Sequence, residues 1–256
     1  MSYIPRIKSV AGLSIQLAKA DFKLRNEGSY LGIFWYLLSP LLMFTLLFFI
    51  FQSRLGTGIE YYALYLFLGI IMFNFFQSTS LEATKSLMHE NVWLIKSINF
   101  PRESLIGAIV LRNLFSHLFE FGLFVVLFLF FNIPIINLLF YLIVLIFLVM
   151  FILGVSLILS SFTVYFADLD NIWTFFTRIL WLGTPIFYTI GSQNGLLAVN
   201  LFNPLYYFIT FSRDLIIYSS WPEPLIFFGV VFWSFFFLVT GILVFNKLKG
   251  RLAELI

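Results

Sequence analysis

The chain has 256 residues, of which 61% are hydrophobic and only 11% are charged, and its formal net charge is +3. A soluble domain has about a quarter of its residues charged. This composition therefore excludes an ordinary soluble protein and indicates an integral membrane protein. The sequence has no cysteine, which excludes a disulfide framework and a cysteine-based metal site or nucleophile.

The first predicted element is an amphipathic helix over residues 8–25. Val10, Leu13 and Leu17 recur at helical spacing on one face, while Lys23 lies off that face. A short basic amphipathic helix directly before a lipid-spanning segment is typical of an interfacial helix at the level of the lipid headgroups. An ordinary cytosolic helix is the alternative interpretation.

Six later stretches are long and apolar enough to cross a bilayer as helices, since a hydrocarbon core of about 30 Å takes roughly 20 residues. They are residues 30–51, 61–83, 103–131, 137–163, 171–190 and 223–246. The apolar segment between the last two is too short to span twice, so we expect short re-entrant or interfacial outer helices there. The predicted fold is an all-α integral membrane protein, with one transmembrane domain over residues 1–256.

The distribution of basic residues predicts the orientation of these spans. With the N-terminus inside, most lysines and arginines fall on one side of the membrane, and only Arg54 and Arg213 fall on the other. Positive residues accumulate in cytoplasmic loops. We therefore expect both termini in the cytoplasm.

Several ionisable residues fall inside the predicted spans, namely Glu82, Arg112, Glu120 and Arg178. A charged side chain at this depth is costly unless it is paired or faces protein or water. A structural pairing of Arg112 with Glu120 or with Glu82 is one interpretation. A wet face along a transport pathway is the other.

The longest cytoplasmic connection, residues 84–104, contains an apolar patch that water would disfavour. The patch and its flanks comprise Asn91, Trp93, Leu94, Ile95, Lys96 and Phe100. A short amphipathic helix in a cytoplasmic loop predicts docking to a partner protein. An interfacial helix without a partner is the alternative.

The second cytoplasmic turn contains Asp168 and Asp170 on either side of Leu169. Such a pair can hold a metal-bound diphosphate, but capping of the next helix is the ordinary explanation, and we predict no metal site. The sequence also has no phosphate-binding loop of the form G-x-x-x-x-G-K-S/T. We therefore expect no cofactor in this chain, and any ATPase that drives it is a separate chain.

Motifs along the chain add a family resemblance. Leu31-Gly32, Trp35 and Pro40 lie in the first span, and Asn91 to Lys96 precedes Phe100-Pro101-Arg102-Glu103. Thr184-Pro185-Ile186-Phe187-Tyr188 lies in the fifth span, and Arg213-Asp214-Leu215 lies in the outer segment. In this order, and over nearly the whole chain, the motifs resemble the permease subunits of ABC exporters for lipid-linked polysaccharides. Ser97 departs from the family, which often has a second lysine there.

This resemblance implies a homodimer of six-span permeases in the bacterial inner membrane, with two separate ATPase subunits that bind ATP and Mg on the cytoplasmic side. The implied substrate is undecaprenyl-diphosphate-linked O-antigen, or a related teichoic acid or capsule chain. The permease itself is then not an enzyme. The apolar loop patch becomes an ATPase-coupling helix, with Asp168 beside it.

Two groups of candidate substrate residues follow from the implied function. Lys23 and Arg25 are candidates for contact with the substrate diphosphate, and binding of ordinary anionic lipid is the alternative. Aromatic rings suit the apolar faces of sugars, because they need no fixed hydrogen-bond pattern. The candidates are Trp35 and Tyr36 near the entrance, and Tyr188, Tyr206 and Tyr207 near the outer exit, with an interfacial aromatic belt as the alternative.

Other functions compete with polysaccharide export. A sister permease for a smaller lipid or drug is the nearest alternative. A membrane-embedded glycosyl- or acyltransferase needs a positioned acid, base or nucleophile, and the two histidines, His89 and His117, lie far apart in the sequence. A membrane scaffold that transports nothing is the third alternative function.

Overall fold

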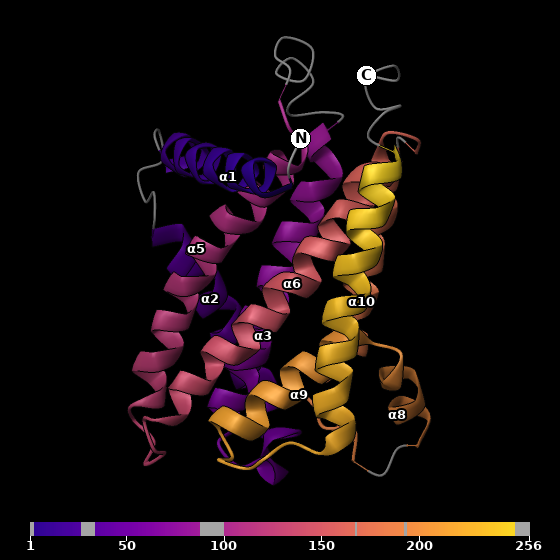
Figure 1. Cartoon of the computed structure of the whole chain (residues 1–256). Helices are drawn as coiled ribbons and strands as arrows, with labels where there is room; N and C mark the ends of the chain where they lie inside the picture. Colours follow the sequence, from indigo (N-terminus) through magenta and orange to yellow (C-terminus); the bar gives the residue numbers. More distant parts are fainter. Residues whose placement is uncertain (1–2, 27–33, 88–99, 167, 192–193, 249–256) are drawn as a thin grey trace.

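The computed structural model describes residues 3–26, 34–87, 100–166, 168–191 and 194–248, and this part of the chain consists of helices joined by turns. Long helices lie side by side, and α1 (Tyr3–Asn26) lies across one end of them (Figure 1). The C-terminal end of α10 (Pro224–Leu248) reaches the same end, which we call the α1 end. The predicted amphipathic helix over 8–25 falls within α1, and its place at a membrane surface stays a prediction.

Four helices in the described part are long and apolar enough to cross a membrane, so the chain is a multi-pass membrane protein. They are α3 (Tyr62–Lys85), α5 (Glu103–Phe128), α6 (Asn137–Thr163) and α10. Helices α2 (Phe34–Phe51) and α7 (Leu169–Gly183) lie in the other two predicted spans but are shorter. Six complete spans are therefore not established.

Helix α7 ends at Gly183, seven residues before the predicted end of the fifth span at 190. Thr184 has extended backbone, with φ −80° and ψ 137°. The following residue, Pro185, has no N–H to donate and disfavours helical geometry in the residue before it. The predicted span over 171–190 is therefore not one continuous helix, because its helical part ends at Gly183.

The outer segment between α7 and α10 contains two short helices, α8 (Asn194–Leu201) and α9 (Pro204–Ile216). The Asn203 side chain caps α9 by accepting a hydrogen bond of 3.1 Å from the Leu205 N–H, and Pro204 occupies the first turn. A 3₁₀ turn, η1 (Gly56–Gly58), follows α2. Short helices stand where the sequence predicts them, and their re-entry into a membrane stays a prediction.

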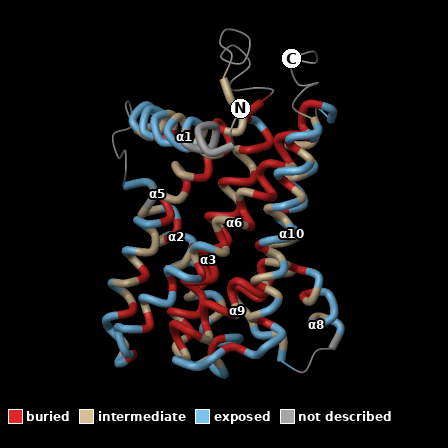
Figure 2. Tube along the Cα trace, viewed as in Figure 1, coloured by how far each residue is buried: buried red, intermediate tan, exposed pale blue. Residues whose placement is uncertain are grey.

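Helix α3 forms the centre of the bundle. Of its most apolar stretch, 78% is buried inside the chain, compared with 22% for α10. It packs against α2, α5, α6, α7 and α9. The buried trace accordingly runs through the middle of the molecule while the outer helices are exposed (Figure 2).

Helices α6 and α10 approach each other closely at two glycines. A Cβ atom added at Gly154 would lie 2.3 Å from the backbone carbonyl of Phe237, and one at Gly241 would lie 2.4 Å from the carbonyl oxygen of Gly154. Small residues let membrane helices pack backbone to backbone. This contact fixes α10 against the core.

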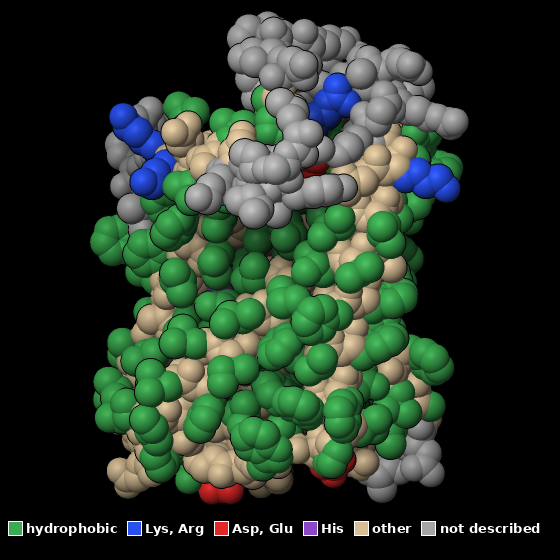
Figure 3. Space-filling model, in the orientation of Figure 1, with side chains coloured by type: hydrophobic (Ala, Val, Ile, Leu, Met, Phe, Trp, Pro, Cys, Tyr) green, Lys and Arg blue, Asp and Glu red, His purple; other side chains and the backbone are tan. Residues whose placement is uncertain are grey.

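Charged side chains are concentrated at the two ends of the molecule. Hydrophobic side chains cover the middle of the face in Figure 3, while Lys and Arg lie at the α1 end and Asp and Glu lie chiefly at the opposite end. A membrane-spanning surface needs such an apolar belt. The basic α1 end is the end that the sequence places in the cytoplasm, and this orientation stays a prediction.

Candidate functional site

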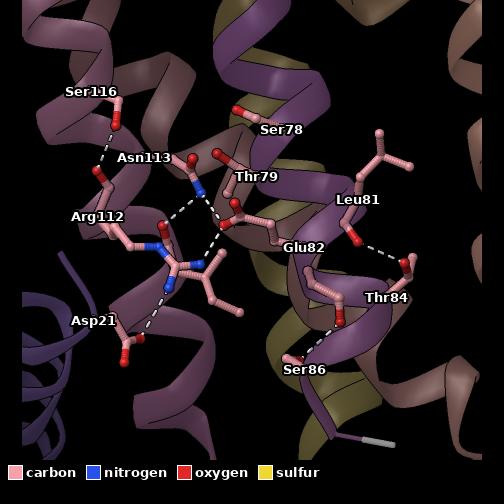
Figure 4. Close-up of polar contacts among 12 residues, drawn as sticks. Asp21, Ser78, Thr79, Leu81, Glu82, Thr84, Ser86, Arg112, Asn113 and Ser116 are labelled. Carbon is pink, nitrogen blue, oxygen red and sulfur yellow. Dashed lines mark hydrogen bonds and ion pairs between the residues drawn. The ribbon is translucent and has the colours of Figure 1, made fainter. Parts of the chain in front are cut away.

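An ion-pair cluster connects α1 to two helices of the bundle near the α1 end (Figure 4). Arg112 on α5 donates to Glu82 on α3 at 2.5 Å and to Asp21 on α1 at 3.1 Å. The Asn113 side chain donates to the same Glu82 oxygen at 2.6 Å. One guanidinium group thus bridges carboxylates from two other helices.

The cluster is partly shielded from solvent. The side chains of Arg112 and Glu82 are 12% and 20% exposed, whereas that of Asp21 is 41% exposed. Burial raises the pKa of Asp21 above its ordinary value, although the Arg112 guanidinium acts in the opposite direction. The Arg112–Glu82 pair is therefore the more protected half of the cluster.

A second contact holds α1 against α5. The Ser14 hydroxyl donates to the Ser104 carbonyl oxygen at 3.1 Å. The approach is close, because a Cβ at Gly107 would lie 2.5 Å from Ser14 Oγ. Since α1 is fixed to α5 here and to α3 and α5 at Arg112, a displacement of α1 must either move these helices or break the ion pairs.

Glu120 lies apart from Arg112, in a separate buried group. Its carboxylate is 3.7 Å from Nδ1 of His117, whose Nε2 is 2.6 Å from the Tyr141 hydroxyl. His117 and Tyr141 are each 1% exposed. Of the two predicted partners for Arg112, the structure therefore selects Glu82.

Arg178 differs from the other three predicted intramembrane residues because it lies on the surface of the chain. Its neighbour Thr177 is buried, and the Thr177 hydroxyl accepts a hydrogen bond of 3.3 Å from Gln77 of α3. Within the described ranges, no hydrogen bond or ion pair to Arg178 is found. It is an exposed charge on an apolar helix.

The predicted aromatic residues fall in different environments. Trp35 is 49% exposed on α2, and Tyr188 and Tyr206 are half-buried at the outer end. Tyr207 is only 5% exposed, and its hydroxyl donates to the Leu201 carbonyl oxygen at 2.8 Å. The side chain of Tyr36 lies outside the described part. Of the described members of this set, Tyr206 and Tyr207 contact each other, with ring centroids 5.4 Å apart.

Of the predicted coupling patch, the structure describes only Phe100. Asn91, Trp93, Leu94, Ile95 and Lys96 lie outside the described residues. Phe100 is half-buried against a small apolar cluster that includes Leu87 of the α3 end and Leu105 of α5. Of the two predicted diphosphate residues, Lys23 is exposed on α1, and the side chain of Arg25 is not described.

The second cytoplasmic turn does not show the predicted capping bond. Asp168 is exposed and stands at the N-cap position of α7, but its side chain makes no capping hydrogen bond. Asp170 instead accepts a hydrogen bond of 2.8 Å from the Asn171 N–H. No group of three or more potential metal ligands occurs in the described ranges.

Arg213 has a structural role that the sequence did not reveal. It is 3% exposed on α9, and its guanidinium donates to the carbonyl oxygens of Pro185 at 2.7 Å and of Ile186 and Tyr65 at 2.9 Å. The guanidinium also lies over the Tyr65 ring. The carbonyl groups beyond a helix end need partners. In the sequence, Pro185 indicates a break in the helix, and a break leaves carbonyl groups that need a donor such as a nearby arginine.

A cavity of about 350 Å³ opens at the end of the molecule opposite α1. It lies among the end of α2, η1, the start of α3 and the region after α5. Its lining residues are Phe48, Gln52, Gly56, Thr57, Ile59, Tyr62, Ala63 and Phe131. None of the residues predicted as functional from the sequence lines this cavity.

Comparisons with known proteins cover most of the chain. The family described as "ABC-2 type transporter" matches residues 14–217. The chain is 28% identical over 259 residues to the O-antigen export system permease protein RfbA of Klebsiella pneumoniae, and the match covers 95% of both chains. A protein of the same name from Myxococcus xanthus is 26% identical over 198 residues, which is 76% of each chain.

Proposed function

The chain belongs to the ABC-2 type transporter family, and we propose that it is the channel-forming subunit of an exporter for undecaprenyl-diphosphate-linked O-antigen polysaccharide. It is a transport subunit without an ATPase domain, and its family implies separate ATPase subunits as partners. The substrate proposal rests on one observation. Similarity over 95% of the chain links it to permeases named for O-antigen export.

We propose that the working unit contains two copies of this chain and two ATPase subunits in the bacterial inner membrane. Two features favour a pathway between copies rather than within one. The centre of a single chain is filled by α3, whose residues Leu64 to Phe73 are almost entirely buried. Helices α2 and α7 expose large apolar side chains, such as Phe49 at 76% and Ile172 at 60%, which a second copy can cover in part.

We further propose that movement of the ATPase reaches the bundle through two routes at the α1 end. The loop patch of Trp93 and Leu94, with Asp168 nearby, forms the docking surface, and Phe100 connects that loop to the apolar cluster between α3 and α5. The Asp21–Arg112–Glu82 cluster connects α1 to the same two helices. Both routes therefore lead to the helix pair α3 and α5.

The aromatic residues supply a separate proposal about the pathway. Trp35, Tyr36, Tyr188 and Tyr206 are proposed to contact the moving sugar chain, because ring faces make weak and exchangeable contacts with sugars. Tyr207 is the fifth candidate, and its burial predicts the lowest accessibility of the set. Single cysteines at these positions should react with a water-soluble thiol reagent during ATP-driven transport. Labelling of all five by lipid-soluble reagents alone would contradict the proposal.

The substrate is tested in vesicles that contain the permease purified with its ATPase partner. We expect undecaprenyl-diphosphate-linked glycan to stimulate ATP hydrolysis and to become accessible to a glycan-binding protein on the far side of the membrane. Undecaprenyl diphosphate without glycan serves as the control. Stimulation by small lipids or drugs, but not by the glycan, would instead favour a sister permease for a smaller substrate.

A further inference from the structure

Helix α7 has one face directed into the protein and one directed away from it. The inner face is fixed against α3 by two hydrogen bonds, from Trp173 Nε1 to Ser80 Oγ at 2.9 Å and from Gln77 to Thr177 at 3.3 Å. The outer face is a stripe of exposed residues at helical spacing. The stripe consists of Asn171, Phe175, Arg178 and Leu182, and α7 also exposes Ile172, Phe176 and Ile179 beside it.

Measured along the helix axis from the start of α7, Arg178 lies about half the thickness of a hydrocarbon core along this stripe. It is nine residues beyond Leu169, where α7 begins, which corresponds to about 14 Å at 1.5 Å per residue. The hydrocarbon core is about 30 Å thick. The hydrogen bond between Thr177 and Gln77 gives the same depth, because Gln77 lies eight residues before the end of α3 at Lys85, or about 12 Å.

An exposed arginine at this depth cannot simply face lipid at low cost. Ionisable side chains within a membrane face a protein interior or a water-filled space, and they mark substrate pathways. No acidic residue occurs in the sequence between Asn171 and Leu182. The residues that flank Arg178 on the stripe, Phe175 and Leu182, are each 65% exposed. Beyond Asn171 at its start, this stripe is therefore apolar except for one cation.

We propose that Arg178 of each copy in a two-copy assembly faces the transport pathway, and that the two guanidinium groups together bind the diphosphate of the lipid-linked substrate near mid-membrane. This inference rests on the proposed function. Two-fold symmetry places the same residue on both sides of the axis. Two facing cations repel each other when no anion lies between them, and a diphosphate offers one phosphate to each guanidinium in the bidentate geometry that arginine favours.

The pairing also gives the diphosphate a place to pause between the two membrane surfaces. Lys23 lies on α1 at one end of the bundle, and Arg213 at the other end is occupied by backbone carbonyl groups. Among the described residues of α7, Arg178 is therefore the exposed cation, and it lies between the two ends of the bundle. A headgroup that enters at the α1 end and passes along the outer face of α7 meets the Arg178 guanidinium.

The test uses the absence of native cysteine. Leu182→Cys places a thiol on the same stripe, one turn beyond Arg178, at a position where 65% exposure leaves the core intact. The purified complex is placed in phosphatidylcholine vesicles, and the rate of reaction with an anionic water-soluble thiol reagent is measured. Undecaprenyl diphosphate, undecaprenol or phosphatidylglycerol is then added. Phe175→Cys is a second reporter, and Phe228→Cys on the outward face of α10 is the lipid-facing control.

We expect undecaprenyl diphosphate to slow labelling of Leu182→Cys about tenfold, because charge-assisted bonds to phosphate hold it at the site. Undecaprenol and phosphatidylglycerol should have little effect, and Arg178→Gln should abolish the protection while Arg178→Lys retains part of it. Any of three results would overturn the proposal: equal protection by phosphatidylglycerol, protection that survives Arg178→Gln, or failure of both reporters to react. The assay needs neither glycan nor ATP hydrolysis, so its failure is distinct from absent stimulation by the lipid-linked glycan.

Discussion

Substitutions in the Asp21–Arg112–Glu82 cluster should destabilise the protein in a fixed order. Arg112→Gln removes the cation that lies 2.5 Å from the Glu82 carboxylate, whose side chain is 20% exposed. Removing one partner of a buried ion pair costs about 3–5 kcal/mol. Because the hydrogen bond from Asn113 survives, the expected loss is about 3 kcal/mol.

The other two substitutions should cost less. In Glu82→Gln, the amide oxygen still accepts from Asn113 and Arg112 keeps Asp21, so the expected loss is that of one hydrogen bond to a charged group, about 1.5–3 kcal/mol. Asp21 is 41% exposed. Solvent screens its pair with Arg112, and Asp21→Asn should cost less than about 1 kcal/mol.

The measurement is the free energy of unfolding in mixed micelles, titrated with a denaturing detergent. Arg54→Gln is the matched control, because Arg54 is an exposed arginine in the turn after α2, and its loss should change stability by no more than about 0.5 kcal/mol. The double variant Arg112→Gln/Glu82→Gln should lose less than the sum of the two single changes, since the two residues interact. Additive losses, or an Asp21→Asn loss as large as that of Arg112→Gln, would refute the reasoning.

Three further predictions concern other parts of the chain. Trp93→Ser together with Leu94→Ser should abolish co-purification of the ATPase, and a complex that survives both changes with normal activity contradicts the docking assignment. Neutralising Lys23 and Arg25 should raise the glycan concentration needed to stimulate ATP hydrolysis, whereas an unchanged dose response leaves only binding of ordinary lipid. Gly154→Ala should lower the unfolding free energy by about 1–3 kcal/mol, because the added Cβ overlaps the α10 backbone; wild-type thermal stability would exclude this.

Local sequence determined the helices of this protein. The stretch predicted over 137–163 coincides with α6 (Asn137–Thr163), and that over 61–83 differs from α3 (Tyr62–Lys85) by one residue at its start and two at its end. A long apolar run must satisfy its own backbone groups when it lies in lipid, and a helix does so within the segment. Such a helix can therefore be predicted from the apolar sequence of its own segment alone.

At the end of α7, the sequence contains a helix-breaking proline, but the apolar residues around it favour a longer predicted span. Thr184-Pro185 is a local signal that disfavours a continuing helix, but the apolar residues beyond it extend the predicted span to 190. The structure ends the helix at Gly183, and the freed carbonyl groups of Pro185 and Ile186 bind Arg213. Hydropathy measures the preference of a segment for lipid, and it does not register whether the backbone continues as a helix.

The sequence by itself thus determined that the chain is helical, where its apolar helices lie, and which ionisable residues stand among them. Which of these residues meet was decided only by the tertiary structure. Spacing along the chain left Glu82 and Glu120 as equal partners for Arg112 and gave no sign of Asp21, which is 91 residues away. Periodicity places a side chain on a face of its own helix. The packing of α1, α3 and α5 fixes which faces approach, and so Arg112 is bound to two carboxylates while Arg178 is left on the outer surface.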